Sequence, residues 1–254
     1  MKISLITVCY NSEAHLRSTI ESVLHQTYPD IEYILIDGNS QDHTVDIIRE
    51  YEPAFHGRLK WISEPDQGIY DAMNKGIRMA IGEIVGILNS DDFYTHPACL
   101  ETIAGVFEDA GMDSCFADVR FVKPENLDQT VRYYSSAKFN PAKFRWGFMP
   151  AHPTFFVRKK YFDEMGYYKT DYRIAADFEL LIRFLYVRKL SYRYLPLDLV
   201  KMRMGGRSTQ SWKSNYILNK EIVRACKENG IYTHLFILLL KYFRKIVELI
   251  RTKN

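Results

Sequence analysis

The chain has 254 residues, of which 47% are hydrophobic and 26% charged, and its net charge is +3. That length suffices for one large α/β domain with a helical appendage, and the composition is that of a soluble protein. A membrane span is excluded, because the most apolar run, residues 235–240, is far shorter than the roughly 20 residues required. Four cysteines without short spacings exclude a zinc knuckle and a disulfide framework, so reduced thiols in the cytosol are expected.

Charge is unevenly distributed along the chain. Residues 183–254 carry 16 Lys and Arg against 4 Asp and Glu, whereas residues 1–182 carry 18 against 27. An acidic front half fits a site that uses a cation, and a basic rear fits an anionic partner such as membrane lipid or a diphosphate. No nucleic-acid partner is expected. The N-terminus enters an apolar strand at once and lacks the layout of a signal peptide.

Strands and helices alternate through the first 95 residues. This order predicts a parallel, helix-covered sheet with right-handed crossovers, whose strands all end along one edge. Polar residues follow each strand, so they should gather at that edge. The expected strands are 3–9, 32–37, 59–62 and 84–88, and the expected helices are 13–26 (capped by Asn11 or Ser12), one through 45–48, and 69–81.

The strand at 84–88 is followed by two adjacent carboxylates, Asp91 and Asp92. A buried strand that ends in two charges is typical of a functional site, because these charges do not stabilise a fold. Carboxylate oxygens in this place can hold a hard divalent cation. The alternative is that they are the N-cap and a solvated neighbour of a helix beginning near Pro97.

The first half lacks the usual glycine-rich phosphate loops. Neither Gly-x-Gly-x-x-Gly nor Gly-Lys-Ser/Thr follows a strand, so a dinucleotide fingerprint and an ATPase loop are absent from the sequence. The remaining pattern fits one nucleotide held by side chains. Tyr10 could stack on a base, Asp37 could accept a base N–H such as that of uracil, and Asp91 with Asp92 could serve metal and ribose. Alternatively, Asp37 and Asp42 are turn and N-cap residues.

The second half is expected to complete the fold and supply the acceptor side. Asp177 opens an apolar helix, His152 stands at the entrance of a strand, and paired glycines follow the last strands. The predicted segments are strands between 113 and 134 with a loop at 123–129, an aromatic loop at 144–152, strands at 153–158, 191–195 and 197–204, a mobile or hinge segment at 204–209, and helices at 214–229 and 231–251.

Four motifs in order within ninety residues are similar to those of inverting family 2 glycosyltransferases. They are TVCYN at 7–11, IDGNSQDHT at 36–44, SEPDQGIYDAMNKG at 63–76 and LNSDD at 88–92. The resemblance covers about residues 1–210 and implies the GT-A fold, a mostly parallel Rossmann-like α/β sheet flanked by helices. It divides the chain into a nucleotide-binding half (1–95), an acceptor and catalytic half (96–210), and a helical basic tail (211–254).

The resemblance also implies roles for particular residues. Asp92 would coordinate Mg²⁺ or Mn²⁺ bridging the donor diphosphate, Asp91 would hold the ribose or a metal-bound water, and Asp177 would be the catalytic base. Tyr10 and Asp37 would contact a uracil-like base. The implied nucleotide-sugar contacts are Thr7, Tyr10, Asn11, Asp37, Asp66, Gly68, Asn74, Lys75, Asp91 and His152.

Two departures from the family pattern concern these roles. Met73 stands where many relatives have Arg before the motif Asn, so Lys75 or the metal would have to balance the diphosphate. Ala176 stands where the family usually has an acid before Asp177. The alternative role of Asp177 is that of a carboxylate in the first helical turn, favoured by the helix dipole. Glu179 is a reserve candidate for the base, and His152 is either structural or a contact to donor phosphate or acceptor.

The expected reaction is metal-dependent, inverting transfer of one sugar from a UDP-sugar to a lipid-linked or growing oligosaccharide acceptor in cell-surface polysaccharide synthesis. The Gln-x-x-Arg-Trp motif of processive relatives is absent from the sequence. The last helix has a wide apolar face with basic margins, which predicts peripheral contact at the cytoplasmic face of the inner membrane, or packing on the domain or in a homodimer. A non-catalytic nucleotide-binding scaffold of a polysaccharide assembly complex is the alternative.

Overall fold

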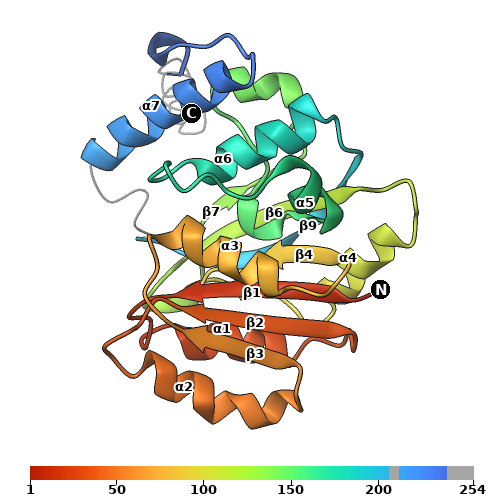
Figure 1. The fold of residues 1–254 in the computed structure, drawn as a ribbon, viewed down its shortest axis with the longest axis vertical. Coiled ribbons are helices and arrows are strands. Elements are labelled where there is room, and N and C mark those ends of the chain that lie inside the picture. The colour runs from red at the N-terminus through yellow and green to blue at the C-terminus, as the bar shows by residue number, and fades with distance from the viewer. Residues whose placement is uncertain (206–211, 239–254) are drawn as a thin grey trace.

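A nine-stranded sheet forms the centre of the molecule, in the order β3-β2-β1-β4-β8-β6-β9-β5, with β7 paired to β6 outside that order (Figure 1). The computed structural model describes residues 1–205 and 212–238. The strands are β1 (Ile3–Cys9), β2 (Ile31–Asp37), β3 (Leu59–Ser63), β4 (Ile84–Ile87), β5 (Phe93–Tyr94), β6 (Ser114–Lys123), β7 (Asn126–Tyr134), β8 (Phe156–Arg158) and β9 (Tyr192–Arg203).

The first four strands pair in parallel, as predicted. In their register Cys9 lies opposite Asp37, and Asp37 lies opposite Ser63. On the other side of β1, Ile6 lies opposite Ile87 of β4. The strand ends, and the polar residues that follow them, therefore share one edge of the sheet.

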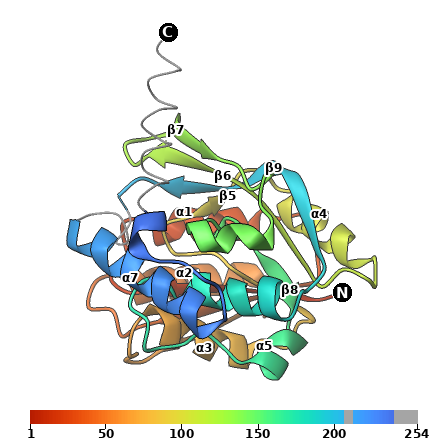
Figure 2. The same ribbon diagram turned by 90° about the horizontal axis from the view of Figure 1, so that it is seen from above.

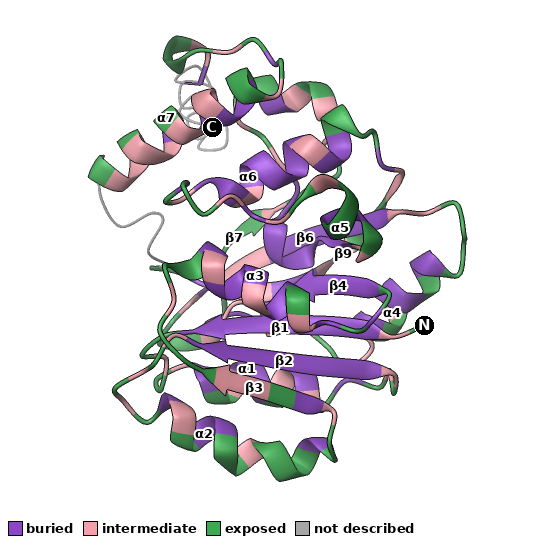
Figure 3. Cartoon of the chain, viewed as in Figure 1, coloured by how far each residue is buried: buried purple, intermediate pink, exposed green. Residues whose placement is uncertain are grey.

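Helices cover both faces of this sheet (Figures 1 and 2). Apolar residues of α1, α2 and α4 pack with those of one face, and residues of α3, α5, α6 and α7 pack with those of the other. All seven residues of β1 are buried for this reason, and Figure 3 shows the same for its neighbours. The helices are α1 (Leu16–Leu24), α2 (Thr44–Tyr51), α3 (Ile69–Met79), α4 (Cys99–Phe107), α5 (Lys160–Met165), α6 (Ala176–Leu181) and α7 (Trp212–Glu228).

The N-terminus of α1 differs from the prediction of a helix from residue 13 with an Asn11 or Ser12 cap. The helix begins at Leu16, and no side chain caps it. Asn11 has a positive φ of 49°, so the chain makes a left-handed turn before the helix. Its side chain is used elsewhere, since Oδ1 accepts the N–H of Gln41 at 2.9 Å.

The second half departs further from the prediction. Residues 192–203 form one strand, β9, because the bulge between the pairs Phe116–Tyr194 and Asp118–Asp198 accommodates Pro196, which cannot donate to a ladder. The loop expected at 123–129 is shorter, since β7 already begins at Asn126. A 3₁₀ helix, η3 (His152–Thr154), replaces the first part of the strand predicted at 153–158, because Pro153 supports a turn.

Helix α7 is an integral part of the second half. Its residues Ile222, Ala225 and Cys226 are buried in the same core as Phe178 and Leu181 of α6. The helix predicted at 231–251 and the segment 204–209 lie largely outside the described residues. Within residues 1–205 and 212–238, no helix is both long and apolar enough to cross a membrane. All four cysteines are buried, unbonded thiols.

Candidate active site

An exposed aromatic ring and a carboxylate lie together at the edge where β1 and β2 end. The Tyr10 side chain is 48% exposed. Between it and Asp66 lies Gly38, where an added Cβ would stand 2.5 Å from Asp66 Oδ2 and 3.4 Å from Tyr10 Cδ2. A Cβ at residue 38 would therefore displace the Asp66 carboxylate, whereas its distance to the Tyr10 ring would be an ordinary contact. This arrangement presents a stacking surface beside a hydrogen-bond acceptor.

Asp37, predicted to contact a base, is fully buried. Its carboxylate accepts the backbone N–H of Ser40 at 3.0 Å and the hydroxyl of Ser63 at 2.6 Å. The Ser40 hydroxyl and the Cys9 thiol also donate to it. The Cys9 thiol has only one hydrogen and also lies within reach of the Ile36 carbonyl, so Asp37 accepts three firm hydrogen bonds at about four acceptor positions. Asp37 therefore holds the β2–α2 turn, and its contact with a base stays a prediction.

Two further predicted contacts are buried inside the protein. Thr7 is fully buried, and its hydroxyl accepts a hydrogen bond from Tyr33 at 3.1 Å. Asn74 is 3% exposed, and its side chain both accepts from the Tyr168 N–H at 2.9 Å and donates to the Tyr168 carbonyl at 2.8 Å. Both side chains are thus engaged within the protein, Asn74 by tying α3 to the second half of the chain, and their contact with a donor stays a prediction.

The segment before α3 is a turn built around Gly68. This residue has φ of 115°, which side-chain-bearing residues rarely adopt, and its N–H donates to Asp66 Oδ1 at 2.8 Å. Lys75 points back to the same turn, where its Nζ lies 2.9 Å from Glu64 and 2.8 Å from the Pro65 carbonyl. The charge of Lys75 is thus already compensated, which weakens its predicted role in balancing a diphosphate.

Asp91 and Asp92 lie in the turn after β4. Asp92 is 1% exposed, and its Oδ2 accepts from Asn89 Nδ2 at 3.2 Å. Burial, and then the neighbouring Asp91 charge, raise the pKa of Asp92 well above its ordinary value. The alternative helix-cap role is wrong, because α4 begins only at Cys99, after strand β5, and its N-cap is Ala98.

Arg203, at the end of β9, was not singled out in the sequence. It donates to the Asp91 carbonyl, and its Nη2 donates to the Ser18 hydroxyl at 2.7 Å. Its guanidinium therefore fixes the backbone of the Asp91–Asp92 turn from a strand more than a hundred residues away. Nothing in the local sequence around Arg203 indicates this contact.

The donor set around Asp92 fits a hard divalent cation. Within the described residues, no cluster of three or more His, Cys, Asp or Glu side chains could hold a metal. However, the Asn89 Oδ1 is buried there without a hydrogen-bond partner, next to the buried Asp92 carboxyl. Two carboxylates and an amide oxygen, completed by diphosphate oxygens, match the way Mg²⁺ is usually held in phosphate-transfer sites.

Asp177 lies in the first turn of α6 and is partly exposed. Burial raises its pKa, and a positive charge on His152 opposes that shift. His152, in η3, is buried, and burial lowers its pKa. Its Nε2 lies 2.7 Å from the Tyr168 hydroxyl, whose ring in turn stacks on Tyr70 at 5.8 Å between centroids. Asp177 therefore faces a packed group of one histidine and two tyrosines.

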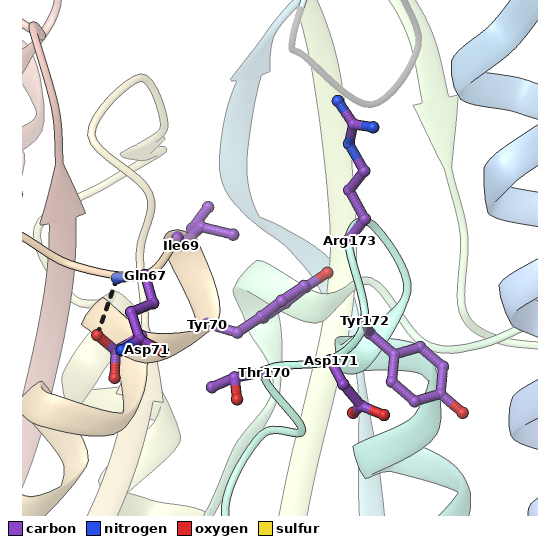
Figure 4. Close-up of a pocket in the computed structure, with 9 residues that line it drawn as sticks. Gln67, Ile69, Tyr70, Asp71, Thr170, Asp171, Tyr172 and Arg173 are labelled. Atoms are coloured by element: carbon purple, nitrogen blue, oxygen red, sulfur yellow. Dashed lines mark hydrogen bonds between the residues drawn. The ribbon is translucent and has the colours of Figure 1, made fainter.

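A cleft of about 260 Å³ separates the start of α3 from the segment that leads to α6. Figure 4 shows residues of α3 on one side, with Tyr70 reaching across, and residues 170–173 on the other. The Tyr70 hydroxyl donates to the Ile174 carbonyl, three residues before Asp177. The cleft is lined by Gln67, Gly68, Ile69, Tyr70, Asp71, Thr170, Asp171, Tyr172 and Arg173.

Glu179, the reserve candidate for the base, serves a structural role instead. It is fully buried, and its carboxylate lies 2.9 Å from Lys169 Nζ and 2.8 Å from Arg183 Nε. Helix periodicity already indicates that residues 177 and 179 face different directions. The Asp177 side chain is therefore the acidic group of α6 that remains available near the cleft.

Comparison with known proteins identifies the class to which this site and fold belong. Residues 4–166, more than half of the chain, match the family model described as glycosyl transferase family 2. The chain therefore belongs to this family and is a glycosyltransferase, as the motifs predicted.

Relatives and solved structures agree with that assignment. A PGL/p-HBAD biosynthesis glycosyltransferase of Mycobacterium tuberculosis is 28% identical over 247 residues, which are 96% of this chain and 91% of the relative. A second glycosyltransferase from that organism is 33% identical over 183 residues, covering 71% and 68%.

The structural neighbours share the fold. S. aureus TarS 1–349 in complex with UDP-GlcNAc aligns with a TM-score of 0.68 and 19% identity, over 89% of this chain and 66% of TarS 1–349. The mannosyltransferase PcManGT from Pyrobaculum calidifontis, in complex with GDP-Man and Mn²⁺, aligns with a TM-score of 0.66 and 16% identity, over 93% and 68%. The fold is the GT-A fold.

Proposed function

We propose that the protein transfers one sugar, with inversion, from a UDP-sugar to a hydroxyl group of a lipid-linked or growing glycan. The observation that carries this proposal is the partly exposed Asp177, whose raised pKa suits a general base. Asp177 does not itself line the cleft, but its charge acts on Tyr70, which does, and it follows the cleft-lining segment 170–173 by four residues. A base with a pKa nearer to the working pH is more effective, and such catalysis contributes about 10²- to 10⁴-fold.

The nucleotide would bind at the edge formed by Tyr10, Gly38 and Asp66. Because Asp37 is buried and already accepts three hydrogen bonds from Ser40 and Ser63, we propose that the partly exposed Asp66 accepts the base N–H while Tyr10 stacks on the ring. Asn11 and Gly68 would shape the same edge through their left-handed turns. The TarS structures in complex with UDP and UDP-GlcNAc support a uracil base, whereas the PcManGT complex makes GDP the necessary comparison.

Asp91 and Asp92 would hold Mg²⁺ or Mn²⁺ together with Asn89. When bound, such an ion neutralises charge on the leaving diphosphate. The chain's own part is to keep these oxygens in place: Arg203 holds the Asp91 backbone, and Asn89 orients the Asp92 carboxyl. Asp177 would take the proton from the acceptor hydroxyl, with His152 and Tyr168 supporting it from the other side.

The acceptor would be presented at a membrane surface, at the cytoplasmic face. Tyr232 and Phe236 are 74% and 67% exposed, and the Thr233 hydroxyl donates to the Arg145 carbonyl at 2.6 Å, beside the 38% exposed Trp146. Exposed aromatic rings with basic neighbours are typical of membrane-interface contacts. Sedimentation with vesicles of anionic and of neutral lipid tests this, and equal recovery in the supernatant with both would contradict it.

A panel of UDP-sugars and GDP-mannose, assayed for donor hydrolysis and for transfer to glycolipid extracts, tests the activity. Calorimetry with UDP and GDP, each with and without Mn²⁺, tests the donor site. We expect the protein to release UDP from a UDP-sugar in the first assay. In the second assay, we expect Mn²⁺ to increase the affinity for UDP. Binding without any turnover of any donor would favour the alternative, a nucleotide-binding scaffold of an assembly complex.

A further inference from the structure

The backbone just before Asp177 is held by a carboxylate from a different helix. Glu221 of α7 accepts three consecutive N–H groups: Arg173 at 2.8 Å, Ile174 at 2.8 Å and Ala175 at 2.9 Å. Its Oε1 takes the first, and its Oε2 takes the other two. Glu221 therefore accepts the N–H groups of all three residues.

These N–H groups need a partner because the chain supplies none locally. Of the three residues, Ala175 is the N-cap of α6, and its N–H is one of the N–H groups at a helix start that have no partner within the helix. A carboxylate is also the group that the positive end of a helix favours. Glu221 thus caps the N-terminus of α6 from another helix, α7, which begins only at Trp212.

The same peptide is held from the opposite side by the nucleotide-binding half. The Tyr70 hydroxyl of α3 donates to the Ile174 carbonyl, and the Tyr70 ring is buried and stacks on Tyr168. Ile174 is therefore fixed through its N–H by α7 and through its C=O by α3. Figure 4 shows this segment facing Tyr70 across the cleft. Asp177 follows three residues later.

We infer that Glu221 is a positioning residue for the transfer reaction: its carboxylate holds residues 173–175 and thereby aims the Asp177 side chain at the acceptor hydroxyl. This inference rests on the proposed function of Asp177. A misplacement of about 1 Å in a reacting group can cost on the order of 10²-fold in rate, so loss of the clamp should reduce turnover strongly. Donor binding, which we propose to involve Tyr10, Gly38 and Asp66, should not change, because Glu221 contacts none of these residues.

The charge of Glu221 also acts on Asp177. Asp177 is surrounded by His152 of η3, Tyr168, Tyr70 of α3 and Glu221 of α7. Burial is the largest cause of the raised pKa of Asp177, and the negative charge of Glu221 adds to it. A neutral side chain at 221 should therefore lower the pKa of Asp177. A substitution that only destabilises the fold should not shift this pKa.

The variants Glu221→Gln, Glu221→Asp and Glu228→Gln test the inference on the full chain. Glu228 is the matched control: it lies on α7, pairs with Lys169 and Arg224, accepts the Tyr172 hydroxyl at 2.9 Å, and makes no bond to residues 173–175. For Glu221→Gln we expect kcat to fall roughly 10- to 100-fold at unchanged donor KM and UDP affinity, with the acidic limb of the pH profile moved to lower pH. Glu221→Asp keeps the charge, so its acidic limb should stay in place.

Glu228→Gln should lower the melting temperature without moving the acidic limb. The inference is overturned if Glu221→Gln leaves kcat unchanged, or if it lowers kcat, UDP affinity and melting temperature together without moving the acidic limb. A wild-type protein that transfers no sugar from any donor would overturn the proposed function, and with it this role. An active wild type with an unaffected Glu221→Gln would overturn the role of Glu221 alone.

Discussion

The two halves of the molecule place their acidic side chains in different ways. In the first half, Asp37 and Asp91 follow parallel strands, and the register of those strands brings them to one edge. In the second half, Asp177 lies on a six-residue helix whose start is held by α3 and α7. The positions of the first-half acids thus follow from the strands that precede them in the sequence. The position of Asp177 instead depends on contacts between segments that are distant in the sequence.

The comparison also shows that an acid in a recognised motif need not face a ligand. Asp37 stands at the end of β2, yet four protein donors surround it. Asp66 belongs to a loop, yet its carboxylate shares the exposed edge with Tyr10. We therefore expect substitutions at Asp37 to act mainly on stability, and substitutions at Asp66 mainly on binding. The following predictions test whether an acid acts on stability or on binding, and whether the two halves of the molecule contribute differently to the reaction.

Asp177→Asn should have the largest effect. Asparagine keeps the shape but cannot accept a proton, so transfer should fall by about 10²- to 10⁴-fold while UDP affinity stays the same. Kinetics and calorimetry on the same preparation measure both. The control is Asp109→Asn, a change at an exposed acid that pairs with Arg193 and does not line the cleft. Equal loss of transfer and of UDP binding in Asp177→Asn would show a structural role.

Asp92→Asn should remove the effect of Mn²⁺ on UDP binding. We expect the metal-dependent gain in affinity to fall at least roughly tenfold, since even residues that merely support metal ligands contribute that much. Calorimetry with and without Mn²⁺ measures the gain. In contrast, Asp66→Asn should weaken UDP binding equally in both conditions, and a variant at 92 that responds to Mn²⁺ as the wild type does would exclude a metal at this turn.

Ser63→Ala should reduce stability with little effect on turnover. It removes the 2.6 Å hydrogen bond to the buried Asp37 carboxylate, which keeps its bonds from Ser40, and a hydrogen bond to a charged group contributes about 1.5–3 kcal/mol of unfolding free energy. Urea denaturation followed by circular dichroism measures this cost. Ser63→Thr retains the hydroxyl and serves as the control. A large rise in donor KM without loss of stability would mean that Asp37 contacts the nucleotide after all.

The pH dependence should have opposite signs for stability and for rate. The pKa of Asp177 in the folded state is raised above its ordinary value of 3.8. At pH values between the ordinary pKa and the raised pKa, the folded state therefore binds more protons than the unfolded state. The contribution of Asp177 to stability is therefore complete below about pH 4 and is lost as pH rises through the raised pKa. Transfer should instead increase over that range, because the base must be ionised.

Thermal melts and pH–rate profiles of the wild type and Asp177→Asn measure both signs. The variant should lose the acidic limb of its residual rate, and its stability should decline less than that of the wild type as pH rises through this range. A wild-type rate that falls as pH rises through the same range would exclude Asp177 as the base. This is the smallest of the expected effects, because other carboxyl groups titrate nearby.

Much of the first half could be predicted from local patterns. Apolar runs of strand length predicted the four parallel strands, and α3 begins at the predicted residue, Ile69. The four motifs predicted the family, which the match to residues 4–166 confirms. Strands and turns can be predicted in this way because the hydrophobic pattern and the turn residues that define them lie close together in the sequence.

Hydrogen-bond partners could not be predicted in the same way. The hydrogen bonding of Asp37 involves Ser63 from another strand, and the Asp91 turn requires Arg203. Residues 192–203 form one strand because a bulge against β6 absorbs Pro196, which sequence analysis interprets as a break. Each of these features joins segments that only the folded chain brings together.

Sequence alone therefore determined the family, the order of the first strands and the group of acids that could do chemistry. The tertiary structure decided which of these acids are buried within the protein, as Asp37 is, and which remain partly exposed, as Asp66 is. It also decided that α7 belongs to the second half and caps the helix that carries Asp177. The physical reason is that strand and turn formation depends on neighbouring residues, whereas burial and pairing of a charge depend on every segment packed around it.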